Sequence, residues 1–126
     1  MMRHLTVVAA LTALLAGCQS TDDGGTDDKQ AANALSTGLA DAIGRCWFGP
    51  NETAFSGYIY TPENVGGLGR ILIVPKDQPT GRPALVVQPR SGTAVDVYGP
   101  LAASALGPRI NADISRWQSG GTGCGS

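Results

Sequence analysis

Histidine is almost missing from this chain of 126 residues, and the one histidine, His4, lies close to the start. Residues 5–126 therefore contain no imidazole, which excludes Ser-His-Asp and Cys-His catalysis from that part of the chain. Cysteine is also scarce, because only Cys46 and Cys124 follow residue 18. Two thiolates without histidine are a poor set for zinc, which needs four sulfur or nitrogen ligands, so we predict no metal site.

No excess of one charge is present either. Residues 34–126 hold seven Lys or Arg and six Asp or Glu. A nucleic-acid-binding domain would carry a basic excess, so we predict no nucleic-acid partner. The carboxylates lie mostly beside turn residues and show no spacing that makes two of them converge, as a glycosidase requires. The glycine-rich segment 63–70 fits neither phosphate-loop pattern and is predicted to be a hairpin loop. We therefore predict no enzymatic activity and no bound cofactor.

The chain also lacks an apolar run long enough to span a bilayer, which takes about 20 residues. Its uncharged run from Leu5 to Ala16 follows Arg3 and His4 and ends in small residues. A basic start, a short apolar core and a small-residue end are typical of a secretory signal peptide. We predict that residues 1–17 form such a signal peptide.

The residues Leu15-Ala16-Gly17-Cys18 resemble the lipobox of bacterial lipoproteins. The resemblance implies that the signal is cut before Cys18, that the thiol carries diacylglycerol and that the new amino group is acylated. Two or more acyl chains hold a protein firmly on a membrane, whereas one does so only marginally. Gln19 follows the cysteine where an aspartate would imply retention at the inner membrane. The resemblance therefore implies the outer membrane. We predict that the domain faces the periplasm.

Residues 18–33 are predicted to be the lipidated cysteine and a flexible acidic tether. Residues 19–33 hold four aspartates, one lysine and no large apolar side chain, so they cannot repay the entropy of ordering. Residues 34–126 are predicted to form a single small domain. Because the exported compartment is oxidising, Cys46 and Cys124 are predicted to form a disulfide. We expect Trp47 and Trp117 to pack together near this bond.

Helical and strand patterns follow one another in the predicted domain. Apolar residues recur at helical spacing in 34–46 and again in 100–118, where Gly107-Pro108 is expected to kink or split the helix. Between them lie four short apolar runs that each end in proline: 55–62, 70–75, 84–89 and 93–100. Short strands separated by turn residues predict an antiparallel meander. The predicted fold class is α+β, a small four-stranded antiparallel meander with an N-terminal and a C-terminal helix packed on one face.

Two groups of side chains are candidates for partner binding. They are Tyr58, Tyr60 and Tyr98, and Arg70, Arg82 and Arg90. Exposed together on the outer sheet face, the tyrosines would mark a protein-binding patch, and cross-strand packing is the alternative. Gathered at one end of the sheet, the loop arginines would grip an anionic group, and scattered surface charge is the alternative.

The segment Ile43-Gly44-Arg45-Cys46-Trp47 resembles the start of the C-terminal domain of TolA-type envelope proteins. Four predicted strands instead of a hairpin, and no strand after the last helix, depart from that pattern. The resemblance implies protein–protein contacts in the periplasm rather than catalysis. We predict a lipid-anchored interaction or structural module that holds an envelope protein or peptidoglycan through its open sheet face or an edge strand. The alternative is a binding or inhibitor domain whose arginines recognise an enzyme or an anionic cell-wall or lipid ligand.

Overall fold

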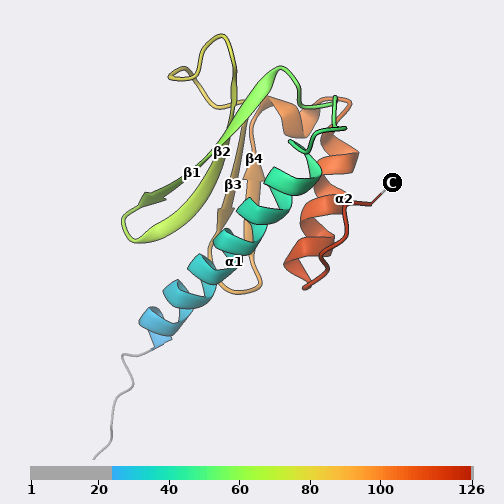
Figure 1. Cartoon of the computed structure of the whole chain (residues 1–126). Helices are drawn as coiled ribbons and strands as arrows, with labels where there is room; N and C mark the ends of the chain where they lie inside the picture. The colour runs from blue at the N-terminus through green and yellow to red at the C-terminus, as the bar shows by residue number, and fades with distance from the viewer. Residues whose placement is uncertain (1–23, 126) are drawn as a thin grey trace, which may run out of the picture.

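The structure, a computed structural model, describes residues 24–125, which form one sheet with two helices against it (Figure 1). The elements are α1 (Gly24–Cys46), β1 (Tyr58–Val65), β2 (Leu68–Pro75), β3 (Leu85–Pro89), β4 (Val95–Tyr98), the 3-10 helix η1 (Pro100–Ala103) and α2 (Gly107–Gln118). The sheet is antiparallel throughout, in the order β1-β2-β3-β4. This confirms the predicted α+β class. The predicted signal peptide and the lipobox-like residues, with Cys18, lie outside the described residues.

The core forms between one face of the two central strands and both helices. Side chains alternate between the faces of a strand, and Ile71 and Ile73 of β2 point to the same face as Leu85 and Val87 of β3, all fully buried. Two helical stripes cover that face: Leu39, Ala42 and Ile43 of α1, and Ile110, Ile114 and Trp117 of α2. Burying each large aliphatic side chain contributes about 1.5–3 kcal/mol, which explains why both helices dock on one face.

The β1–β2 hairpin is longer than the sequence predicts. Its turn consists of Gly66 and Gly67 with φ of 61° and 84°, and positive φ at both positions matches a two-residue type I′ turn. The predicted loop 63–70 is therefore wrong in extent, since the ladder continues to Val65 and resumes at Leu68. Pro62 lies inside β1 rather than at its end. An edge strand tolerates proline where the missing N–H would face away from the ladder.

The C-terminal helical segment is split into two helices, as the sequence predicts. Gly107 and Pro108 open α2, and η1 precedes them as a separate short helix. No strand follows α2 within residues 24–125. The structure therefore differs from the TolA-type pattern in both ways that the sequence predicted: it has four strands in place of a hairpin, and no strand follows the last helix in this range.

The helix α1 begins at Gly24, ten residues before the predicted domain boundary at Ala34. The prediction of a flexible tether is therefore wrong for residues 24–33. Ala32 is buried, and Asn33 donates a hydrogen bond to the Gly67 carbonyl (2.9 Å) and accepts one from the Gly69 N–H (2.8 Å). These tertiary contacts compensate for a polar sequence with little helical drive of its own. Residues 25–31 are exposed, and the first turns of α1 extend past the sheet (Figure 1).

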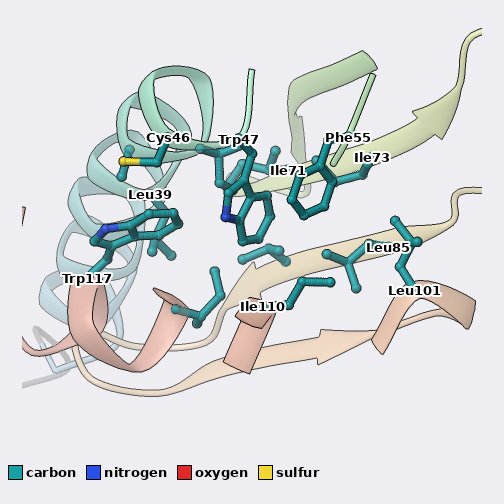
Figure 2. Packing of buried hydrophobic residues seen from close by; sticks show 14 residues of the cluster. Leu39, Cys46, Trp47, Phe55, Ile71, Ile73, Leu85, Leu101, Ile110 and Trp117 are labelled. Atoms are coloured by element: carbon teal, nitrogen blue, oxygen red, sulfur yellow. The ribbon is translucent and has the colours of Figure 1, made fainter. Parts of the chain in front are cut away.

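Aromatic side chains and a disulfide close the far end of α1. Cys46 and Cys124 are bonded, with sulfurs 2.02 Å apart, which confirms the predicted pair. Trp47 stacks on Phe55 with ring centroids 4.7 Å apart and contacts Trp117 at 5.5 Å, as Figure 2 shows from close by. The tail before Cys124 is held by more than the disulfide, because the Gly123 carbonyl accepts a hydrogen bond from Trp117 Nε1 (2.8 Å).

Replacing Gly38 by alanine is expected to stabilise the domain by about 0.5–1 kcal/mol. Gly38 is exposed in the middle of α1, and a Cβ there would meet nothing within 4 Å. The gain is measured as the free energy of unfolding in urea. Gly49→Ala is the matched control, since its Cβ would lie 2.5 Å from the Arg45 carbonyl oxygen and should destabilise the fold. A loss of stability in Gly38→Ala would contradict the helix register.

Candidate functional site

The three predicted tyrosines do not share one face of the sheet. Tyr60 pairs with the buried Ile73, so Tyr58 and Tyr60 point to the helix-covered side of β1. Tyr98 pairs with Val86, whose neighbour Val87 belongs to the core, so Tyr98 lies on the open face. The hypothesis that the three tyrosines form one patch is therefore wrong, because β1 and β4 occupy opposite edges and present tyrosine to opposite faces.

The predicted arginines are also separated. Arg82 precedes β3 and Arg90 follows it, so five strand residues, about 17 Å of extended chain, lie between them. Two of the three are engaged by carboxylates: Arg70 pairs with Glu63, directly opposite on β1, and Arg90 Nε lies 2.9 Å from Asp96 Oδ2. Of these three arginines, Arg82 alone makes no ion pair with a residue from 24 to 125. The structure thus does not form the arginine cluster that an anion site requires.

A groove near the end of α1 is instead lined by five of the seven aromatic side chains in residues 24–125. We call it the aromatic groove; its volume is about 440 Å³ and it is lined by Trp47, Phe48, Gly49, Glu52, Phe55, Ser56, Tyr58, Ile59, Tyr60 and Lys76. Phe48 packs on Tyr60 with ring centroids 5.0 Å apart and on Phe55 at 5.9 Å. Ile59 and Tyr60 each keep 37% of their surface exposed. Pockets that bind small molecules have volumes of about 300–1,000 Å³, so the groove is large enough for a bulky side chain.

One charge in the aromatic groove is compensated within the molecule and the other is not. Glu52 Oε2 accepts a hydrogen bond from Arg109 Nη2 at 3.0 Å. Lys76 is exposed and makes no ion pair with any residue from 24 to 125. The groove is therefore lined mainly by apolar side chains. Its one unpaired charge among residues 24–125 is that of Lys76, just after β2.

The backbone of β1 is open along the groove. The Ile73 carbonyl accepts a hydrogen bond from the Ala84 N–H (2.8 Å), so Ile73 turns its polar groups toward β3. Antiparallel partners alternate between bonded and non-bonded pairs, so Tyr60, opposite Ile73, directs its N–H and C=O to the free edge. Pro62, two residues on, has a carbonyl but no N–H. The edge strand therefore offers both backbone groups at Tyr60, beside the aromatic groove.

Gly44 lets Tyr60 lie across α1. A Cβ at Gly44 would fall 2.4 Å from the tyrosine oxygen, so any larger residue would displace that ring. Beyond Tyr60 a second depression of about 600 Å³ continues between α1 and the hairpin, lined mainly by polar residues such as Asn33, Asp41 and Asn64. Phe48 and Gly44 were not identified as site residues from the sequence. The adjacent Trp47-Phe48 after a helix was the available signal, but strand pairing was needed to bring Tyr60 to it.

Four of the eight Asp and Glu residues in 24–125 are paired with arginines. Glu52, Glu63, Asp96 and Asp113 each lie in an ion pair. Residues 24–125 contain no group of three or more His, Cys, Asp or Glu placed to hold a metal ion. Within the same range, none of the helices has the length and apolarity that crossing a membrane takes.

Comparison with known proteins found no matching family model, no matching curated protein and no matching solved structure.

Proposed function

We propose that this chain is a lipid-anchored protein of the outer membrane whose domain is a non-enzymatic interaction module facing the periplasm. The lipobox-like residues ending at Cys18 support the anchor, formed by a diacylglycerol thioether and an N-linked acyl chain. The Cys46–Cys124 disulfide fits an oxidising compartment outside the cytoplasm. We propose no other cofactor.

The observation that carries the interaction role is the aromatic groove beside an open strand edge. Exposed aromatic and apolar side chains next to polar ones are typical of protein-binding surfaces. The pairing of Arg70 and Arg90 with carboxylates removes two of the three cations on which the anionic-ligand alternative depends. The structure therefore favours an envelope protein as the partner over an anionic lipid or a peptidoglycan carboxylate.

The length of α1 sets how far the aromatic groove lies from the proposed anchor. Gly24 follows the proposed anchor at Cys18 by six residues. The helix then runs for 23 residues, a rise of about 34 Å, and the aromatic groove begins at Trp47, just past its end. The helix thus separates the groove from the anchored end of the chain.

Site-specific crosslinking in intact cells tests the proposed role. A photoreactive amino acid is placed at Tyr60, in the groove, and separately at Tyr98, which is 49% exposed on the opposite face. We expect one recurring envelope protein to be captured from Tyr60 and not from Tyr98. The same products from both positions, or glycan and lipid products alone, would contradict the proposal.

Replacing Cys18 by serine is expected to abolish lipidation completely, because the thioether needs the thiol. Cells grown with labelled palmitate should label the wild-type protein and leave Cys18→Ser unlabelled. The Cys46→Ser/Cys124→Ser variant is the matched control, since it should keep the label. Labelling of the Cys18→Ser protein would contradict the proposed lipid attachment at Cys18.

A further inference from the structure

We propose that the aromatic groove binds an extended peptide segment of the partner, which pairs with the edge of β1 at Tyr60. The segment places a bulky apolar side chain in the groove and a carboxylate beside Lys76. This inference rests on the proposed role of the groove as the protein-contacting surface and specifies what it recognises.

The backbone groups of β1 set how the segment pairs. The Tyr58 N–H is already used, because it donates to the Phe55 carbonyl at 3.0 Å. Pro62 has no N–H, so Tyr60 is the residue in this half of the strand that offers both a donor and an acceptor to an added strand. The ladder is therefore short and centred on Tyr60, and the remaining affinity has to come from side chains.

The side-chain contacts follow from the same geometry. An added strand directs alternate side chains to the face that Tyr58 and Tyr60 share. There the exposed parts of Phe48 and Tyr60 leave room for an aromatic or large aliphatic group. Lys76 supplies the charge to be complemented, since Glu52 is already held by Arg109. A segment with an apolar residue next to Asp, Glu or a free C-terminus fits both features.

A second copy of this chain fits the edge less well. Symmetric pairing of two β1 strands would put two Pro62 residues in the new ladder, each lacking a donor. Proline on an edge strand is a recognised way to prevent such pairing. A foreign segment without proline meets only one Pro62, so the new ladder loses one donor instead of two.

Selection from a phage-displayed library of random linear 12-residue peptides tests the proposal, with the full mature lipoprotein in detergent micelles as bait. We expect enriched peptides to carry an aromatic or large aliphatic residue within two positions of an acidic residue. Methylation of the backbone nitrogen at the position paired with Tyr60 should abolish binding of a selected peptide. Enriched peptides without the apolar–acidic pair would overturn the proposal.

A charge swap with a matched control locates the carboxylate. Lys76→Glu should weaken binding of a selected peptide about ten-fold, as expected for loss of one charge-assisted hydrogen bond. Arg82→Glu changes the same charge in the same loop outside the groove and should alter affinity less than two-fold. A peptide with lysine in place of its acidic residue should bind Lys76→Glu better than wild type. Equal effects of the two variants would overturn the carboxylate contact.

The remaining outcomes separate the two proposals. Capture of an envelope protein from Tyr60 in cells together with failure of all peptides to bind would leave the interaction role standing and refute the extended-peptide mode. Failure of both experiments would refute both. Sedimentation of the lipoprotein as a dimer that loses peptide binding as it forms would assign the edge to a second copy and overturn the inference.

Discussion

Replacing both Cys46 and Cys124 by serine is expected to lower the free energy of unfolding by about 4–5 kcal/mol in the chain-entropy description of a disulfide. The bond joins positions 78 residues apart, so it restricts most of the domain in the unfolded state. It also ties the C-terminal tail to the end of α1, where Cys46 is buried against the core. A domain of this size has a net stability of only about 5–15 kcal/mol, so the loss would leave it close to unfolding.

Urea denaturation followed by tryptophan fluorescence measures this loss, because Trp47 and Trp117 lie in the same part of the core as the bond. Either single variant should lose nearly as much as the double variant, since one missing thiol already removes the bond. The wild-type protein in reducing agent provides the matched control and should show the same loss. A difference under 1.5 kcal/mol between oxidised and reduced wild type would contradict the prediction.

Replacing Asp113 by alanine is expected to cost about 2–4 kcal/mol of stability, the range for breaking a buried charged hydrogen-bond network. Asp113 is 3% exposed, and its Oδ2 accepts a hydrogen bond from Trp47 Nε1 at 2.8 Å. Arg116 pairs with its other oxygen, and Arg109 Nε lies 3.5 Å from Oδ2. Alanine would leave the buried indole N–H without an acceptor and two guanidinium groups without their shared carboxylate.

Two variants identify the origin of that cost. Asp113→Asn keeps an acceptor for Trp47 and loses only the charge, so it should cost about half as much as alanine. Asp96→Ala breaks the exposed Arg90 pair, in which the carboxylate side chain is 46% exposed, and should cost less than about 1 kcal/mol. All three are compared by urea denaturation. A loss in Asp113→Ala no larger than in Asp96→Ala would show that the buried network does not stabilise the fold.

Much of the fold could be read from local patterns. Four apolar runs with turn residues between them predicted four strands in the observed meander, and Gly107-Pro108 predicted the division of the last helical segment. These features follow from backbone chemistry within a few residues, where proline and glycine act directly. The disulfide followed from the presence of two cysteines in the predicted exported domain. The boundary errors at Pro62 and Gly24 came from contacts that local pattern does not contain.

The candidate site depended on register. Alternation within a strand predicts which residues share a face of that strand, but it does not say which face meets the helices. Pairing of Tyr60 with Ile73 and of Tyr98 with Val86 sent the tyrosines to opposite faces. The same pairing placed Glu63 opposite Arg70. This arginine, which the sequence predicted to bind a partner, therefore forms an ion pair within the sheet.

By itself, the sequence determined the α+β class, the strand order of the meander and the cysteine pair, because these depend on composition and on short-range chain chemistry. Only the tertiary structure decided the site. It brought Phe48 after α1, Tyr60 on β1 and Lys76 after β2 together in one groove and left the β1 edge open beside them. These residues are distant in sequence, and their meeting is set by strand register and by how α1 lies on the sheet, which are long-range packing outcomes.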